Sequence, residues 1–244
     1  MTHVKLILEY DGTDFAGWQY QPNGRSVQEE IEKAIRQITQ EAVRIAGAGR
    51  TDAGVHALGQ VASFALAKDV DLKSFGKSLN AVLPEDVVVV DALPTAMDFH
   101  ARYSATKRRY KYYIMKKPTA VWRRYCWWLN YALDFEAMAA CARMIEGEHD
   151  FASFCKTDSG VEHHRCKIHE SVWRLKGDTL EFDITANRFL YGMVRALVGT
   201  MVEVGRGYRP QSEFEKILNE RDRSKAGMAA PPLGLFLREV LYEL

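Results

Sequence analysis

The sequence lacks the features of a membrane protein or a disulfide-stabilised secreted protein. Its 244 residues include four cysteines, Cys126, Cys141, Cys155 and Cys166, and no two of them form a CxxC pair. Sparse cysteine of this kind favours a reducing compartment, so we expect a cytoplasmic protein. No apolar run approaches the ~20 residues that a membrane helix needs, so we expect no membrane span. No low-complexity tract interrupts the chain.

Acidic side chains are absent from residues 102–124, where nine side chains are basic. The segments before and after carry net charges of −5 and −3, so the overall net charge of +1 conceals one concentrated positive segment. On a strand, Lys107 and Arg109 would share one face, and Arg108 and Tyr110 the other. Basic groups bind phosphates and aromatic rings stack on bases, which makes this segment a candidate RNA-binding strand. The alternative is a solvated charged face with tyrosines in the core.

No dinucleotide or phosphate-loop motif is present, although a glycine-containing loop occurs at 47–60, GAGRTDAGVHALGQ. Asp52 lies there beside Arg50. A carboxylate near a guanidinium stays ionised, as a nucleophile or a base must. A tight turn in which Asp52 caps its own backbone is the alternative, and spacing alone favours that turn.

Two further groups of residues are candidates for chemistry. Cys155, His163, His164, Cys166 and His169 lie close together in sequence, but their spacing matches no zinc motif, so we expect no metal there. Arg195 interrupts an apolar helical stretch. An arginine in that position either extends to the surface or meets a buried carboxylate.

Hydrophobic periodicity predicts two successive β-α-β-β-α-β orders. The strands are expected at 3–10, 42–47, 59–66, 86–92, 107–115, 166–175, 179–186 and 235–242, and the helices at 31–38, 72–79, 135–145 and 188–204. Gly177 and Asp178 indicate a hairpin turn. We therefore expect an α+β fold with two ferredoxin-like halves around a mainly antiparallel sheet, divided into domains at 1–104 and 105–244.

Five segments resemble, in order, the motifs of the TruA family of tRNA pseudouridine synthases. They are EYDGTDFAGWQYQP at 9–22, GRTDAGVHALGQVASF at 49–64, YSATKRRYKYYI at 103–114, NRFLYGMVRALVGTMVEVG at 187–205 and APPLGLFL at 230–237. Together they span nearly the whole chain. The resemblance implies the pseudouridine synthase fold and isomerisation of uridine to pseudouridine at positions 38–40 of the tRNA anticodon stem and loop. It also implies a homodimer that uses neither a metal nor an organic cofactor.

The resemblance also assigns roles to individual residues. It implies that Asp52 is the nucleophile, that Tyr110 stacks on the substrate uracil and that Arg195 pairs with Asp52. Arg50 would support the flipped nucleotide, and Leu235 would line the uracil pocket. The basic residues before the tyrosine, Lys107, Arg108 and Arg109, would bind the tRNA. Gly192 departs from the family pattern, because many relatives have an aromatic residue or a histidine at that position.

Attack by Asp52 at C1′, attack at C6 and proton abstraction at C2′ all fit one carboxylate, and the sequence does not choose among them. Tyr110 is also a candidate base for removing the C5 proton. Two other functions fit parts of the pattern. A non-catalytic RNA-binding protein would need no Asp52, and a nucleoside glycosidase would require a second catalytic carboxylate.

Overall fold

The chain folds into two units. The computed structural model describes residues 1–156, 160 and 162–243. The first unit comprises Met1–Thr106 together with the residues from Phe236 onward, and the second comprises Lys107–Leu235. The last strand of the sequence therefore belongs mainly to the first unit.

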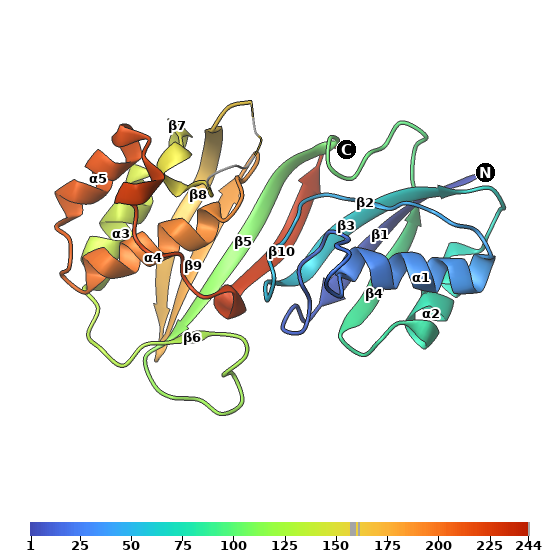
Figure 1. Ribbon diagram of the computed structural model, residues 1–244, viewed down its shortest axis with the longest axis horizontal. Coiled ribbons are helices and arrows are strands. Elements are labelled where there is room, and N and C mark those ends of the chain that lie inside the picture. The colour runs from blue at the N-terminus through green and yellow to red at the C-terminus, as the bar shows by residue number, and fades with distance from the viewer. Residues whose placement is uncertain (157–159, 161, 244) are drawn as a thin grey trace. The chain divides into compact units, whose positions relative to one another are not determined.

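The first unit contains two helices and most of five strands that pair in one sheet (Figure 1). In chain order they are β1 (Thr2–Tyr10), α1 (Val27–Thr39), β2 (Ala46–Gly47), β3 (His56–Leu66), α2 (Leu72–Val82), β4 (Val87–Pro94) and β10 (Leu235–Tyr242). The central strand β1 pairs antiparallel with both β3 and β4, so that Leu6 lies opposite Ala62 and Ala92. β2 and β10 both pair with β3, β2 antiparallel and β10 parallel.

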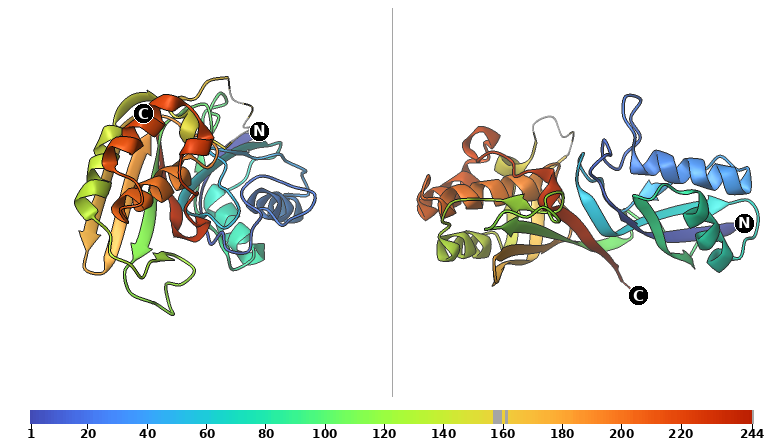
Figure 2. Two further views of the ribbon diagram at one scale, coloured as in Figure 1. Left: turned by 60° about the vertical axis from the view of Figure 1, so that its left-hand side comes forward. Right: turned by 90° about the horizontal axis from the view of Figure 1, so that it is seen from below.

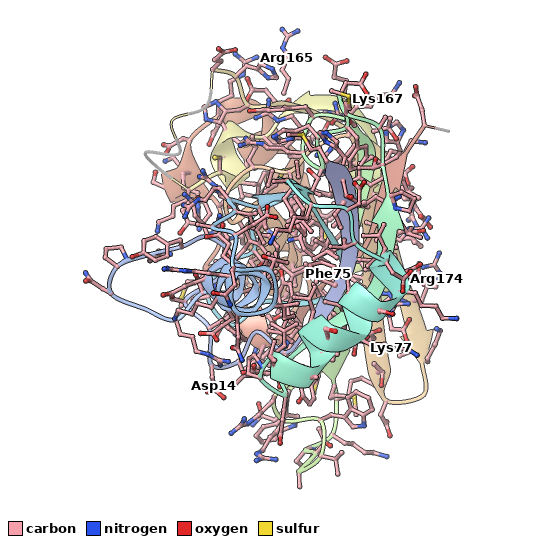
Figure 3. All side chains as sticks on the ribbon, turned by 90° about the vertical axis from the view of Figure 1, so that its right-hand side faces the viewer. Asp14, Phe75, Lys77, Arg165, Lys167 and Arg174 are labelled. Atoms are coloured by element: carbon pink, nitrogen blue, oxygen red, sulfur yellow. The ribbon has the colours of Figure 1, made fainter. Side chains whose placement is uncertain are left out.

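The order β4-β1-β3-β2 is the ferredoxin-like arrangement expected from the sequence. Alternate residues of β1 are buried because one face of the sheet packs against the helices. α1 begins at the Ser26 cap, whose side chain accepts a hydrogen bond from the Glu29 amide, and it buries Ile31 and Ile35. α1 and α2 contact each other. On α2, Phe75 is buried and Lys77 is exposed (Figure 3).

The second unit contains four longer strands, three α-helices and several short elements. They are β5 (Ala105–Met115), β6 (Trp127–Trp128), α3 (Phe135–Met144), β7 (Gly147–Asp150), η1 (Ala152–Phe154), β8 (Arg165–Lys176), β9 (Thr179–Ala186), α4 (Met193–Gly205), α5 (Gln211–Glu220), η2 (Arg223–Lys225) and η3 (Pro232–Gly234). β5, β9, β8 and β7 pair antiparallel in that order, and β6 pairs with β5 in parallel.

The core of the second unit lies between this sheet and its helices (Figure 2). Tyr112, Phe182 and Trp173 lie side by side across β5, β9 and β8, and the indole NH of Trp173 lies 3.3 Å from the sulfur of Met201 on α4. α3, α4 and α5 pack on one another. The predicted hairpin joins β8 to β9 at Gly177, whose φ of 59° suits glycine.

Several elements differ from the sequence prediction. The strand expected at 42–47 is only Ala46–Gly47, and the helix expected from 188 begins at Met193. The helix starts late because Gly192 precedes it with a φ of 71°, a conformation that interrupts helical geometry and that glycine adopts at little cost. The hydrophobic pattern did not predict the short strands β6 and β7, nor α5, which buries Phe214, Ile217 and Leu218.

Replacing Gly199 by alanine is expected to destabilise the protein by about 2 kcal/mol, because overpacking forces the backbone to move. A Cβ on Gly199 would lie 1.8 Å from the carbonyl oxygen of Met228. The matched variant is Gly76→Ala in α2, where the nearest side-chain atom to a new Cβ would be 3.4 Å away. Helix propensity predicts that this control raises stability by up to ~1 kcal/mol. Urea unfolding midpoints measure both changes, and equal shifts would contradict the prediction.

Candidate active site

The loop that carries Asp52 is held by buried hydrogen bonds within the first unit. The hydroxyl of Tyr10 and that of Thr51 share a hydrogen bond of 2.8 Å. The side-chain amide of Gln60 donates to the carbonyl of Gly49 at 2.8 Å, and the Trp18 amide donates to the carbonyl of Thr51. Burial raises the pKa of Tyr10 to about 12, so its hydroxyl stays protonated throughout the physiological range. The backbone on the N-terminal side of Asp52 is therefore fixed.

The N-terminal segment that follows β1 packs directly on this loop. A Cβ on Gly17 would lie 2.7 Å from the Thr51 carbonyl oxygen, and Gly17 has a φ of 112°. A Cβ on Gly12 would lie 2.0 Å from the Val55 carbonyl oxygen. Both positions require glycine because two backbones approach closely. Sequence reasoning assigned no role to these glycines, since nothing local links them to a loop some 40 residues away.

His56 fixes the other end of the loop. Its Nδ1 atom accepts a hydrogen bond from the Gly12 amide at 3.1 Å and lies 3.0 Å from a carboxylate oxygen of Asp11. Its ring stacks on Phe236 of β10, with centroids 4.6 Å apart. The side chain is 1% exposed. Polar contacts thus hold both ends of the loop.

Asp52 is half-buried and Arg50 is exposed on this loop. The Asp52 carbonyl accepts a hydrogen bond from the Val55 amide, which closes a tight turn. The tight backbone turn that was the alternative interpretation of this loop is therefore present. A turn of this kind also presents a side chain at a fixed place, so it does not decide between the two interpretations.

The second unit carries the other predicted site residues. Tyr110 is 7% exposed, pairs in register with Ile184 and packs edge-to-face on Phe189, with ring centroids 5.0 Å apart. It points to the helix-covered face of the sheet, as Tyr112 does. Leu235 is buried where the second unit ends.

Arg195 on α4 is anchored to the segment that precedes β10. Its Nε donates to the carbonyl of Ala230 at 2.8 Å, and the Ala230 amide donates to the carbonyl of Arg195 at 2.9 Å. The neighbouring Pro231 carbonyl accepts a hydrogen bond from the Tyr112 hydroxyl at 2.7 Å. Burial raises the pKa of Tyr112 well above its ordinary value, although the nearby Arg195 opposes that rise. These bonds fix the plane of the guanidinium.

The basic segment of β5 has acidic neighbours that its own sequence does not contain. Lys111 contacts Glu181 at 2.8 Å and Asp183 at 3.4 Å, both on β9. Arg109 lies 3.9 Å from Glu170 on β8. The outer face of this sheet is thus partly neutralised by adjacent strands. Arg108 points the other way, and its guanidinium donates to the Asn187 carbonyl.

The cysteines and histidines between Cys155 and His169 are candidate metal ligands by residue type. Among the described residues, no group of three or more His, Cys, Asp or Glu side chains is placed to hold a metal ion. Cys155 and Cys166 are buried, and burial raises the pKa of Cys166 to about 12. In the absence of a metal, a thiol with such a pKa stays protonated at neutral pH. In the described part of the chain, no helix is long and apolar enough to cross a membrane.

Comparison with known proteins gives a consistent result. A family model described as tRNA pseudouridine synthase matches residues 6–104 and 141–243. The tRNA pseudouridine synthase A of Thermoanaerobacter sp. (strain X514) is 43% identical over 246 residues, which cover 99% of this chain and 100% of that protein. The chain belongs to the TruA family of tRNA pseudouridine synthases. Its members are isomerases that act on tRNA.

Other TruA family proteins match at a similar level. The tRNA pseudouridine synthase A of Caldicellulosiruptor bescii is 41% identical, covering 99% of this chain and 100% of that protein. The protein of the same name from Exiguobacterium sp. (strain ATCC BAA-1283 / AT1b) is 42% identical, with coverages of 100% and 99%. A solved Cbf5-Nop10-Gar1 complex aligns with a TM-score of 0.38 at 11% identity, covering 96% of this chain and 57% of that one.

Proposed function

We propose that this enzyme converts uridine to pseudouridine at positions 38–40 of the tRNA anticodon stem and loop, with Asp52 as its nucleophile. The N-terminal half, 1–104, would supply Asp52 and Arg50. The C-terminal half, 105–244, would supply Tyr110, Arg195 and Leu235. The observation that carries the proposal is the anchored loop: buried hydrogen bonds from Tyr10 and Gln60 fix the backbone beside one half-buried carboxylate.

The chemistry needs few groups. The N1–C1′ bond breaks, the uracil turns, a C5–C1′ bond forms, C5 loses its proton and N1 gains one. No electrons are exchanged with a second reactant. The reacting base first leaves its stack, which costs a few kcal/mol. Stacking on Tyr110 would recover about 1–3 kcal/mol of this cost.

Each remaining residue has a role in the proposal. Asp52 acts by attack at C1′, attack at C6 or proton abstraction at C2′. Arg195 pairs with Asp52 and keeps it ionised. Arg50 supports the flipped nucleotide, Leu235 lines the uracil pocket, and Tyr110 is the candidate base for the C5 proton. Lys107, Arg108 and Arg109 bind the tRNA backbone. The chemistry we propose uses no metal or organic cofactor.

Loss of the C5 hydrogen gives a direct test of the function. tRNA transcripts carrying tritium at C5 of uridine, each with uridine at only one of positions 38, 39 and 40, are expected to release one tritium per product formed. A transcript without uridine at these positions is expected to release none. A nucleoside glycosidase would release labelled uracil, and a non-catalytic RNA-binding protein would release nothing. Either of those results would overturn the proposal.

Replacing Tyr10 by phenylalanine is expected to slow the single-turnover rate by about tenfold without weakening tRNA binding. The variant loses the hydrogen bond to Thr51, so the carboxylate next to it is less firmly placed. The matched control is Tyr20→Phe, because Tyr20 is 43% exposed in the same N-terminal segment. Rapid-quench kinetics with excess enzyme measures both variants. Equal rates for Tyr10→Phe and the control would show that the hydrogen bond does not position Asp52.

We also propose, from the family resemblance, that the enzyme is a homodimer and works in the cytoplasm. Sedimentation equilibrium is expected to give twice the chain mass of 27.8 kDa. A concentration-independent mass equal to one chain would contradict the dimer. Fractionation of cells expressing the tagged full chain tests the location.

A further inference from the structure

Charged side chains on the outer face of the β5–β9–β8 sheet form cross-strand rows. Lys111 lies opposite Asp183, and Arg109 lies opposite Thr185, which in turn lies opposite Glu170. Near the hairpin, Arg174 on β8 pairs with Asp183, and Lys176 contacts Glu181 at 2.9 Å. Most basic side chains on this part of the outer face are therefore paired with acidic side chains of neighbouring strands.

The opposite end of the same face differs. Where β9 ends, Asn187 joins the strands: its amide donates to the Lys167 carbonyl at 3.1 Å, and its side-chain oxygen accepts from the Lys167 amide at 2.9 Å. Ala186 on β9 lies opposite Arg108 on β5 and opposite Ile168 on β8. Extending this register by one residue places Lys107 on one side of Asn187 and Lys167 on the other. Two strand spacings separate the lysines, ~10 Å.

One arginine and one imidazole extend this end of the face. Arg165 is two residues before Lys167 on β8, and both are exposed (Figure 3). His169 occupies the irregular position between Ile168 and Glu170, and burial and the charges of Lys107 and Lys167 lower its pKa. We call Lys107, Arg165, Lys167 and His169 the Asn187 surface.

Acidic groups near the Asn187 surface lie on β7 and β8. On β8, Glu170 follows His169 and is paired with Arg109 at 3.9 Å and with Arg174 at 3.1 Å. Glu148 lies opposite Lys167, and Asp150 lies opposite Arg165. Asp150 is engaged by Arg221, 3.5 Å away, so its charge is shared. The Asn187 surface therefore keeps an excess of positive charge. Like charges placed across a sheet destabilise it unless an anionic partner is present.

The Asn187 surface lies on the opposite face of the sheet from Tyr110. Tyr110, Tyr112 and Ile114 point to the helix side, whereas Lys107 and the other residues at alternate positions point outward. A nucleotide stacked on Tyr110 is therefore out of reach of Lys107 and Lys167. If these lysines bind RNA, they bind another part of it.

We propose that the Asn187 surface binds the phosphate backbone of tRNA at a second place, apart from the nucleotide that reacts at Tyr110. The inference rests on the proposed function, since it assumes that Tyr110 receives that nucleotide. The binding is electrostatic, so it is independent of RNA sequence and weakens as salt concentration rises.

The test compares two variants that remove the same residue types at the same spacing on the same strand. Arg165→Ala with Lys167→Ala changes the Asn187 surface. Arg174→Ala with Lys176→Ala changes the neutralised end of β8. Both variants lose two positive charges, so any effect of overall net charge is equal. The Kd for a tRNA transcript without uridine at 38–40 is measured at several salt concentrations, so that no turnover occurs.

The Asn187-surface variant is expected to raise Kd about tenfold and to reduce the slope of log Kd against log salt by about 1.5. The control variant is expected to change either quantity much less. Restoring charge with Arg165→Lys and Lys167→Arg is expected to restore binding, which excludes a folding defect. Equal effects of the two alanine variants would overturn the inference. An altered sedimentation mass with unchanged Kd would also overturn it and would identify a protein interface instead.

Failure of this inference is distinguishable from failure of the proposed function. The tritium assay with the unmodified enzyme tests the function alone. An enzyme that releases tritium but shows no difference between the two alanine variants keeps its function and loses only the second contact. An enzyme that releases no tritium fails the proposed function whatever its salt dependence.

Discussion

Replacing Asp52 by asparagine is expected to abolish pseudouridine formation and to leave tRNA binding close to that of the unmodified enzyme. Asparagine has nearly the same shape, but its neutral amide cannot act as a nucleophile or as a base. Hydrogen bonds from Tyr10 to Thr51 and from Gln60 to Gly49 hold the loop and are kept in the variant, so the loop is expected to stay in place. The single-turnover rate is expected to fall by at least about 10³-fold.

The matched control for this prediction is Asp91→Asn. Asp91 is exposed on β4, and its carboxylate accepts a hydrogen bond only from the neighbouring Ala92 amide among the bonds described for it. The control therefore makes the same chemical change far along the chain from the loop, and its rate is expected to stay within about twofold of normal. A rate for Asp52→Asn similar to that of Asp91→Asn would rule out Asp52 as the nucleophile.

Replacing Arg195 by lysine is expected to reduce the single-turnover rate by about 10²-fold although the charge is retained. The Arg195 Nε donates to the Ala230 carbonyl, which holds the planar guanidinium in one orientation. Lysine has a single ammonium group. It cannot donate to the Ala230 carbonyl and at the same time bind a carboxylate through two coplanar nitrogens. The expected loss is therefore in the rate rather than in tRNA affinity.

Two further variants serve as comparisons for Arg195→Lys. Tyr112→Phe removes the hydrogen bond to Pro231, next to Ala230, and is expected to produce a smaller rate loss of about tenfold. Arg209→Lys makes the same substitution where the arginine contacts Glu203 and Glu213, and it is expected to keep the full rate. A fully active Arg195→Lys enzyme would contradict a role for the guanidinium fork.

Local sequence patterns predicted most of the elements because each depends on a short-range period. The alternation in β1, the capping of α1 at Ser26 and the turn at Gly177 all follow from residues a few positions apart. The return of β10 to the first unit cannot be predicted in this way, because the residue pattern of a strand does not specify which strand it pairs with. β10 pairs with β3, where Phe236 lies opposite His56, 180 residues earlier in the chain.

The residues proposed to carry the chemistry can be selected from the sequence, but the residues that support them cannot. Asp52 and Tyr110 lie in recognisable segments. Tyr10 reaches Thr51 across 41 residues, and Lys111 reaches Glu181 across 70. Contacts of such separation depend on tertiary packing, which local periodicity does not describe. The pairing of Lys111 with Glu181 and Asp183, which neutralises part of the outer face of the sheet, is a contact of this kind.

The central claim is that a carboxylate at Asp52 isomerises a uridine at positions 38–40 of tRNA. The most direct measurement is chemical labelling of pseudouridine, read at single-nucleotide resolution, with the intact mass of the same tRNA determined in parallel. The unmodified enzyme is expected to create label at a uridine within 38–40 with no change in mass, and Asp52→Asn is expected to create none. Label confined to other positions, a mass loss equal to one uracil, or full labelling by Asp52→Asn would contradict the claim.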